Sequence, residues 1–170
     1  NVLKNATGYN LTQLIIGSEG TLGIVTKIVF RLIPLPKKDI TLLVPFNCSE
    51  KACDAVSAVF RAGITPSALE FIERDAILWT IKYTDIKLEI DDSIMAHLLI
   101  EVDGDNLEKL YEDCELIENV LKKFECGDIL LANSSSEKEN LWKLRRSISD
   151  AVKSNSIYKE EDTVVPRAEL

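Results

Sequence analysis

Two side chains that could bind an anion lie four residues apart in the last part of the chain, Arg145 and Ser149. They fall in a segment whose apolar residues keep helical spacing, so they would lie side by side at the edge of its buried face. A guanidinium can bind both oxygens of a carboxylate at once through its fork of N–H donors. The spacing therefore allows a carboxylate site, although Arg145 and Arg146 could equally be surface cations on a solvated helix.

A second candidate site is a cluster of glycines near the start of the chain, formed by Gly8, Gly17, Gly20 and Gly23. Fixing a glycine costs conformational entropy, so a cluster indicates either positive φ or an approach too close for a Cβ. The cluster leads into a β-branched run at 24–30, which predicts a strand. Rossmann and P-loop glycines instead follow a strand and precede a helix. Those two phosphate motifs are excluded, while a plain tight turn stays open.

Other side chains give weaker signals. The single histidine, His97, falls in an apolar strand pattern and is typical of a sheet histidine. Glu70 and Glu73 flank another predicted strand and could form a paired-carboxylate site, but solvation at a strand end explains them as well. The cysteines show no C-x-x-C pair and no nearby histidine, which indicates reduced thiols rather than metal ligands. They are Cys48, Cys53, Cys114 and Cys126.

The composition limits the classes of function. A chain of 170 residues with 46% apolar residues can bury a core. Its formal net charge of −8 argues against nucleic acid and against an anionic membrane surface. Its apolar runs are far shorter than the roughly 18 residues of a spanning helix, and no signal-peptide pattern opens the chain. We therefore expect a cytoplasmic protein, peripheral to a membrane at most through a partner.

Strands and helices alternate after a charged joint, Lys37-Lys38-Asp39, which we take as the domain boundary. Predicted strands span 40–46, 68–72, 95–102 and 129–132, with one more at 163–165, and predicted helices begin after Asn47, at Arg74, at Leu107 and at Glu137. This order predicts an α+β, ferredoxin-like antiparallel sheet with helices on one face. The other face would be left open.

The sequence motifs of the first segment resemble those of one family. The runs Thr7-Gly8-Tyr9-Asn10-Leu11, Gly17-Ser18-Glu19-Gly20-Thr21-Leu22-Gly23-Ile24-Val25-Thr26 and Pro34-Leu35-Pro36 are similar to the end of the FAD-binding domain in the FAD-linked 2-hydroxyacid dehydrogenases and oxidases. That group contains the glycolate oxidase catalytic subunit and D-lactate dehydrogenase, within the vanillyl-alcohol-oxidase flavoprotein fold. The resemblance implies a fragment: residues 1–36 end the FAD-binding domain, and 37–170 begin the C-terminal domain, which is the cap or substrate domain.

The resemblance also implies a cofactor and its contacts. FAD would be held by ten residues of the first segment: Thr7, Gly8, Tyr9, Gly17, Ser18, Glu19, Gly20, Gly23, Ile24 and Val25. The run 141–146 and the pair Tyr158-Lys159 resemble family positions that hold the substrate. By that match Arg145 binds the C1 carboxylate, Ser149 gives a hydroxyl, and Lys159 adds a second positive contact. The open sheet face would lie over the flavin.

The activity implied is oxidation of a small D-2-hydroxyacid, such as glycolate or D-lactate, to the 2-oxoacid by hydride transfer to flavin. Electrons would pass to an electron-transfer flavoprotein, an iron–sulfur subunit or a quinone, and a homo-oligomer is an option. The family's catalytic histidines, and ligands for a divalent metal, lie beyond this chain, so no catalytic or metal-binding residue is expected in it and the fragment should be inactive. Two alternatives stay open: a non-catalytic ferredoxin-like module that binds a ligand or partner, and a flavoenzyme of the same fold acting on an alcohol or a phenol.

Overall fold

The structure, a computed structural model, describes residues 6–166 and 169. The chain divides into two compact units, of which the first ends at Leu35 and the second begins at Pro36. The predicted boundary lies one residue later. Among the described residues, every buried apolar side chain belongs to the second unit. The second unit is therefore the domain that carries a hydrophobic core.

The first unit contains one short helix, α1, Leu11–Ile15. Asn10 caps it, because its side-chain oxygen accepts the N–H of Gln13 at 3.2 Å. The β-branched run at 24–30 is not a strand, which corrects the prediction. A strand needs a neighbour to take its backbone N–H and C=O groups, and the described residues of this unit supply none.

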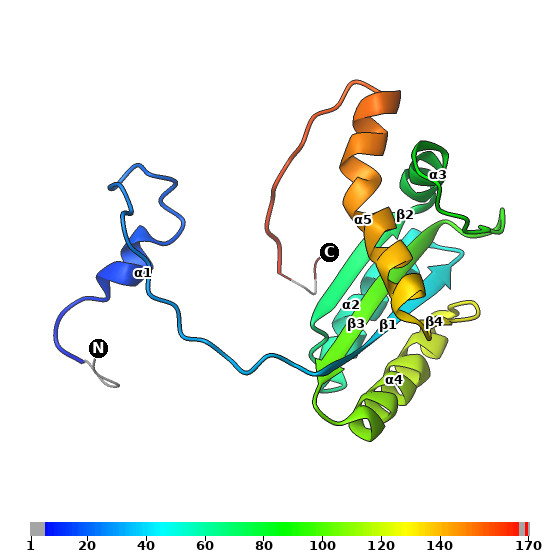
Figure 1. Ribbon diagram of the computed structural model, residues 1–170, viewed down its shortest axis with the longest axis horizontal. Coiled ribbons are helices and arrows are strands. Elements are labelled where there is room, and N and C mark those ends of the chain that lie inside the picture. The colour runs from blue at the N-terminus through cyan, green and yellow to red at the C-terminus, as the bar shows by residue number, and fades with distance from the viewer. Residues whose placement is uncertain (1–5, 167–168, 170) are drawn as a thin grey trace. The chain divides into compact units, whose positions relative to one another are not determined.

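The second unit is built on a four-stranded antiparallel sheet with the order β2-β3-β1-β4 (Figure 1). Its strands are β1, Lys38–Phe46; β2, Ala68–Glu73; β3, Ala96–Gly104; and β4, Leu130–Ala132. The crossover from β1 to β2 leaves room for β3 between them, and the crossover from β3 to β4 leaves room for β1. This split arrangement confirms the predicted ferredoxin-like α+β fold.

Helices α2, Ser49–Arg61, and α4, Leu107–Leu121, cover one face of the sheet. A short 3-10 turn, η1, Lys122–Phe124, follows α4. Alternate residues of β1 and β3 point to this face, among them Leu42, Val44 and Leu98, which are almost fully buried. They form the larger of the two apolar clusters of the domain.

The other sheet face is not open, which corrects the second half of the fold prediction. Helices α3, Arg74–Tyr83, and α5, Ser135–Asn155, pack on it (Figure 1). The physical reason is that β1 and β3 are apolar on both faces: Leu43 and Leu99, which lie opposite each other in the register, point away from the first cluster and are 4% and 1% exposed. Apolar side chains on both faces of a sheet need two covering layers.

After α5 the chain has no regular secondary structure through residue 166. The strand predicted at 163–165 is not formed, and among the described residues that segment has no strand neighbour. None of the helices in the described ranges is long and apolar enough to cross a membrane.

Candidate functional site

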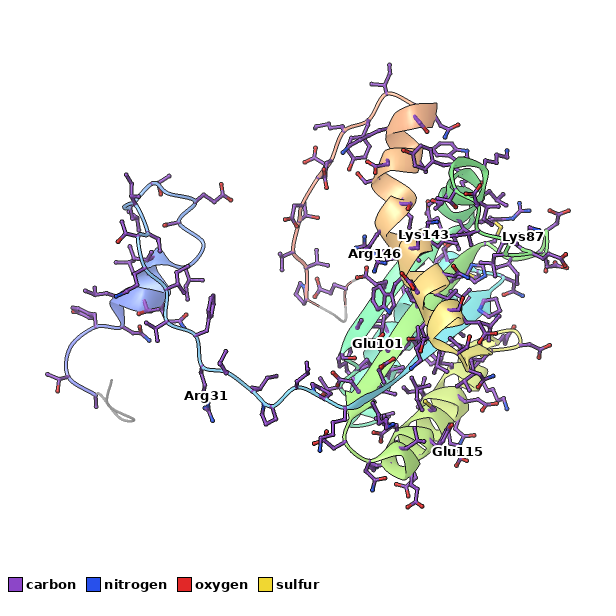
Figure 2. All side chains as sticks on the ribbon, in the orientation of Figure 1. Arg31, Lys87, Glu101, Glu115, Lys143 and Arg146 are labelled. Carbon is purple, nitrogen blue, oxygen red and sulfur yellow. The ribbon has the colours of Figure 1, made fainter. Side chains whose placement is uncertain are left out.

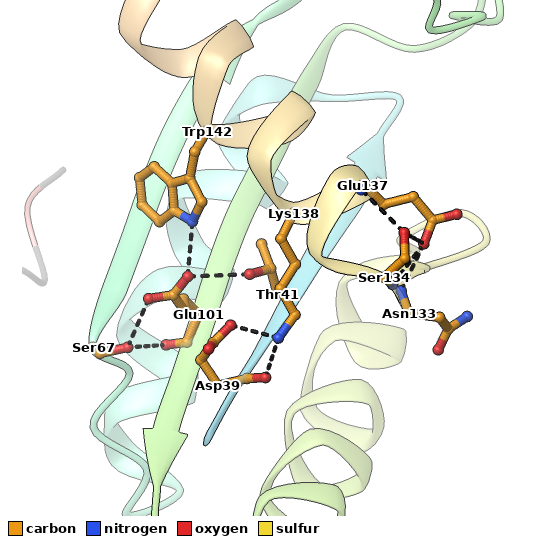
Figure 3. A network of polar contacts seen from close by, with 9 residues as sticks. All are labelled: Asp39, Thr41, Ser67, Glu101, Asn133, Ser134, Glu137, Lys138 and Trp142. Carbon is orange, nitrogen blue, oxygen red and sulfur yellow. Dashed lines mark hydrogen bonds and ion pairs between the residues drawn. The ribbon is translucent and has the colours of Figure 1, made fainter. Parts of the chain in front are cut away.

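Helix α5 carries the predicted substrate residues, and its start is fixed by a capping box. Ser134 precedes the helix, and its side-chain oxygen accepts the N–H of Glu137 at 3.2 Å. The Glu137 carboxylate in turn accepts hydrogen bonds from the backbone N–H groups of Ser134 and Asn133, at 2.9 Å each. The Ser134 hydroxyl also donates to this carboxylate at 3.1 Å, and this bond, together with the two backbone N–H bonds, lowers the pKa of Glu137. The reciprocal contacts satisfy free N–H groups at the helix start, so the register of α5 is set at residue 134 (Figure 3).

One face of α5 is tied to three strands of the sheet. Lys138, Trp142 and Arg145, at spacings of four and three, share that face. Lys138 pairs with Asp39 of β1, Trp142 donates to Glu101 of β3, and Arg145 pairs with Glu70 of β2. The helix therefore crosses the sheet with one donor opposite one carboxylate on each of three strands.

Glu101 is the most connected of these carboxylates (Figure 3). Its side chain accepts hydrogen bonds from Trp142 Nε1 at 2.7 Å, Thr41 Oγ1 at 3.1 Å and Ser67 Oγ at 3.5 Å. Thr41 is fully buried. Because partly buried polar groups are stable only when hydrogen-bonded, this cluster holds α5 on the sheet at one position.

The pair between Arg145 and Glu70 lies beside an open groove of about 290 Å³. Arg145 Nε donates to Glu70 Oε2 at 3.0 Å, and the two side chains are 43% and 34% exposed. Within the described residues, neither Nη group of Arg145 has a partner. The groove is lined by Glu70, Phe71, Arg145, Ile148, Ser149, Val152, Tyr158 and Glu160. A guanidinium with unused donors is thus available to an anion in this groove.

Ser149 and Tyr158 bring two hydroxyl groups to the same groove. Ser149 Oγ donates to Tyr158 Oη at 3.3 Å. The ring of Tyr158 also lies under the ammonium of Lys153, 4.8 Å from its centroid. Since one hydroxyl hydrogen is used between the two oxygens, the other is left as a donor for a ligand.

Two of the three predicted substrate residues, Arg145 and Ser149, thus line one groove, whereas Lys159 is not among its lining residues. Lys159 pairs with Glu161 instead, and its side chain is 83% exposed. Arg146 and Lys143, both labelled on α5 in Figure 2, are exposed. Neither is among the residues that line the groove. The surface interpretation therefore fits Arg146, and the assignment of Lys159 stays a prediction.

The paired-carboxylate interpretation of Glu70 and Glu73 is wrong. Residues three apart in a strand point to opposite faces, and Glu70 lies opposite Leu99 whereas Glu73 lies opposite Ala96. The sequence analysis missed Glu70 as the partner of Arg145. One signal for it was present in the sequence: Glu70 and the apolar Ile72 are two residues apart in a strand, so both point to the same face.

His97 is a buried sheet residue, as predicted, at 4% exposure. Burial lowers its pKa to about 4, and its Nδ1 has no partner among the described residues. The four cysteines are free thiols. Burial raises the pKa of Cys114 to about 11, which makes this thiol a poor nucleophile.

The predicted flavin contacts belong to the first unit, and three of them, Ser18, Glu19 and Gly20, lie in one tight turn. Glu19 and Gly20 both have positive φ, of 48° and 79°, and Thr21 N–H donates to Ser18 O at 2.9 Å. Positive φ at both central residues is characteristic of a type I′ turn. Gly17 also has a φ of 79°, and a Cβ added at Gly17 or Gly20 would meet nothing within 4 Å. Positive φ therefore favours glycine at Gly17 and Gly20, whereas contact with another group does not explain them within the described residues.

A larger hollow, of about 460 Å³, lies between α4 and β4. It contains none of the predicted substrate or flavin residues. Its lining includes three carboxylates, Glu115, Glu118 and Asp128, beside apolar side chains; Glu115 is labelled on α4 in Figure 2. Glu118 is neutralised by Lys122 at 2.5 Å. With no cation in its lining, this hollow is unsuited to a carboxylate.

Comparisons with known proteins identify the family of the chain. Residues 35–170 match the family described as FAD linked oxidases, C-terminal domain. The chain is 34% identical over 170 residues to a D-lactate dehydrogenase of Anaerostipes hadrus, covering 97% of this chain and 36% of the relative. It is 38% identical over 170 residues to glycolate oxidase subunit GlcD of Bacillus subtilis, covering 98% of this chain and 35% of the relative.

A solved structure shares the fold at lower sequence identity. An alkyldihydroxyacetonephosphate synthase matches with a TM-score of 0.55 and 18% identity, covering 88% of this chain and 32% of that one. The chain thus spans about a third of the length of the proteins that it matches.

Proposed function

Since this chain belongs to the FAD-linked oxidases through their C-terminal domain, we propose that it forms the substrate-binding part of an FAD-dependent oxidoreductase acting on a small D-2-hydroxyacid. FAD is the cofactor of the family, as the sequence predicted. When bound, it accepts the hydride that leaves the substrate Cα. The residues of this chain contribute binding and orientation.

The observation that carries the proposal is Arg145, in a groove with two hydroxyl groups and with both Nη donors unused by the described residues. The two Nη groups of Arg145 would bind the C1 carboxylate of the substrate, and the Ser149–Tyr158 pair would donate one hydrogen bond to the same ligand. An alcohol or phenol has no carboxylate to bind both Nη groups of Arg145. The groove therefore favours a carboxylate substrate over those alternatives.

The charges in the groove also favour a substrate with one carboxylate. Two acidic side chains, Glu70 and Glu160, line it with a single cation, Arg145. A second carboxylate on the ligand would meet repulsion from Glu160, since Glu70 is already paired. We therefore propose glycolate or D-lactate rather than D-2-hydroxyglutarate as the substrate.

The first unit would supply part of the flavin site. Its apolar side chains are exposed, for example Tyr9 at 97% and Ile24 at 92%, as expected of a segment that packs into the rest of a FAD-binding domain. The turn at Ser18 to Thr21 would lie against the cofactor. We further propose a cytoplasmic enzyme that passes its electrons to an electron-transfer flavoprotein, an iron–sulfur subunit or a quinone.

The test is anaerobic visible absorption of the full-length protein, with D-lactate, glycolate and D-2-hydroxyglutarate added in turn. A flavin spectrum that is bleached by one of the two monocarboxylates supports both the reaction and the substrate class. Bleaching by D-2-hydroxyglutarate alone contradicts the substrate class. A colourless protein that takes up no added FAD contradicts the proposal and favours a non-catalytic binding module.

Arg145→Ala in the full-length enzyme is expected to raise KM for the preferred 2-hydroxyacid by about 100-fold, because a charge-assisted bidentate contact contributes on the order of 3 kcal/mol. Steady-state kinetics measure this effect. Arg146→Ala is the matched control, since Arg146 is exposed and outside the groove, and should leave KM within about twofold. An unchanged KM in Arg145→Ala removes Arg145 from the site.

A further inference from the structure

The geometry points to Glu70 as a positioning residue that sets which edge of the Arg145 guanidinium is presented to the substrate. This inference rests on the proposed function. Glu70 contacts Arg145 at one atom pair only, Nε to Oε2 at 3.0 Å. It therefore occupies the Nε edge of the guanidinium and leaves the end formed by the two Nη groups.

The two edges of a guanidinium differ in how they bind a carboxylate. The side edge offers Nε–H and one Nη–H, and the end offers one N–H from each Nη group; either can bind both carboxylate oxygens. With Nε engaged, only the end remains for a substrate carboxylate to bind through two donors. Glu70 therefore directs the substrate to a single binding geometry.

Glu70 is itself held by the sheet. It lies in β2 opposite Leu99 of β3, whose side chain is 1% exposed, so its backbone position is fixed by the strand ladder. Arg145, by contrast, is a long side chain on α5 that is 43% exposed. An arginine loses considerable rotamer entropy when it is ordered. Holding Nε against a strand carboxylate restricts the guanidinium before the substrate arrives.

The opposite role for Glu70 predicts a different outcome. As a carboxylate in the same groove, Glu70 could simply compete with the substrate for Arg145. Removing a competitor would lower KM, whereas removing a positioning group raises it. Glu70→Gln separates the two roles, because the amide oxygen still accepts the Nε–H while the negative charge is gone.

The experiment is steady-state kinetics of full-length Glu70→Ala and Glu70→Gln with the preferred 2-hydroxyacid. Positioning predicts that Glu70→Ala raises KM about three- to tenfold with kcat within about twofold, and that Glu70→Gln restores KM to within about twofold of the wild type. Glu73→Ala is the control, since Glu73 is exposed at the end of the same strand, lies on its other face and is outside the groove. A KM lowered in both Glu70 variants overturns the inference in favour of competition.

A double-mutant cycle with Arg145→Ala makes the failure of this inference distinguishable from failure of the proposed function. If Glu70 acts through Arg145, Glu70→Ala changes KM by less than about twofold once Arg145 is alanine. Additive effects of the two substitutions overturn the positioning role while the carboxylate site at Arg145 stands. An Arg145→Ala enzyme with unchanged KM overturns the site itself, and the inference falls with it.

Discussion

At the scale of single residues, the neighbours of a side chain decide what it can do. Histidine and arginine side chains can both do chemistry, and the sequence favoured a structural role for His97 and a carboxylate contact for Arg145. His97 is enclosed by the sheet and its coverings, at 4% exposure, and its lowered pKa keeps it neutral near pH 7. Arg145 keeps two donors for a ligand, because Glu70 takes only its Nε. One residue is thus part of the core, and the other is open to a ligand.

The pKa of His97 gives a pH dependence of stability with a definite sign. Burial lowers this pKa from 6.5 to about 4 in the folded state. Between those two values the unfolded chain binds a proton that the folded chain does not, so the free energy of unfolding rises with pH and is lost as the pH falls from 6.5 toward 4. The loss from this one group is at most about 3 kcal/mol.

His97→Leu should remove that part of the pH dependence, since leucine does not titrate. Urea unfolding of both proteins at pH 7, 6, 5 and 4 measures it. Carboxylates titrate in the wild type and the variant alike, so the difference between the two curves isolates His97. Parallel curves over this range would mean that His97 has the same pKa in the folded and the unfolded chain, which contradicts the prediction.

At the scale of elements, hydrophobic periodicity was enough to predict most strands and helices. Helix α3 is found at Arg74–Tyr83, as predicted, because its apolar stripe is bounded on both sides by polar residues. Helix starts were less predictable. Helix α5 begins at Ser135, two residues before the predicted start at Glu137, which corrects that prediction. Both Ser134 and Ser136 are followed three residues later by a glutamate; the predicted start uses Ser136 with Glu139, whereas the structure uses Ser134 with Glu137. The two boxes look alike in the sequence, so only the packing of α5 selects between them.

The assignment of helices to the two covering layers could not be predicted from any one element. Each strand showed apolar residues on both faces, but nothing local assigns α3 and α5 to the face opposite α2 and α4. The polar contacts of α5 depend on residues from three strands, such as Glu101, which lies 41 positions before Trp142. A pair so far apart in sequence leaves no periodic signal. The pairing of Arg145 with Glu70 escaped prediction for the same reason, since Glu70 lies 75 positions away, whereas Arg145 and Ser149 line one groove as the helical spacing predicted.

The contact between Trp142 and Glu101 should contribute to the docking of α5. Trp142→Phe keeps an aromatic ring in place but removes the Nε1–H that donates to Glu101 at 2.7 Å. A hydrogen bond to a charged group contributes about 1.5–3 kcal/mol, and Thr41 still donates to the same carboxylate oxygen. We therefore expect a loss of about 1–2 kcal/mol in the free energy of unfolding, measured by urea denaturation.

Trp79→Phe is the matched control for that substitution. Trp79 lies on α3, is partly exposed, and has no hydrogen-bond partner for Nε1 within the described residues. Its replacement should change the free energy of unfolding by less than about 0.5 kcal/mol. Equal losses in the two variants would mean that ring packing, rather than the bond to Glu101, accounts for the effect of Trp142→Phe.

At the scale of the whole molecule, the two units differ in what stabilises them. The second unit buries apolar side chains on both faces of its sheet. The described residues of the first unit bury none, and Leu32 and Phe30 are 87% and 76% exposed. Burial of apolar surface is the main favourable contribution to folding. The stability of the chain should therefore lie in residues 36–170.

Removing residues 1–35 should consequently leave the thermal transition of the remaining chain within about 2 °C of that of the 170-residue chain, a shift equivalent to less than 1 kcal/mol. Differential scanning calorimetry compares the two directly. Hydrogen exchange adds a residue-level test: amides of 22–35 should exchange within seconds, whereas those of β3, which pairs with β1 on one side and β2 on the other, should be the most protected. A large drop in Tm on truncation, or slow exchange in 22–35, would show that the first unit contributes to the fold through contacts of its own. Retained stability with fast exchange instead assigns the first unit no part in folding and leaves its apolar side chains free to be covered by other chain segments or by a cofactor.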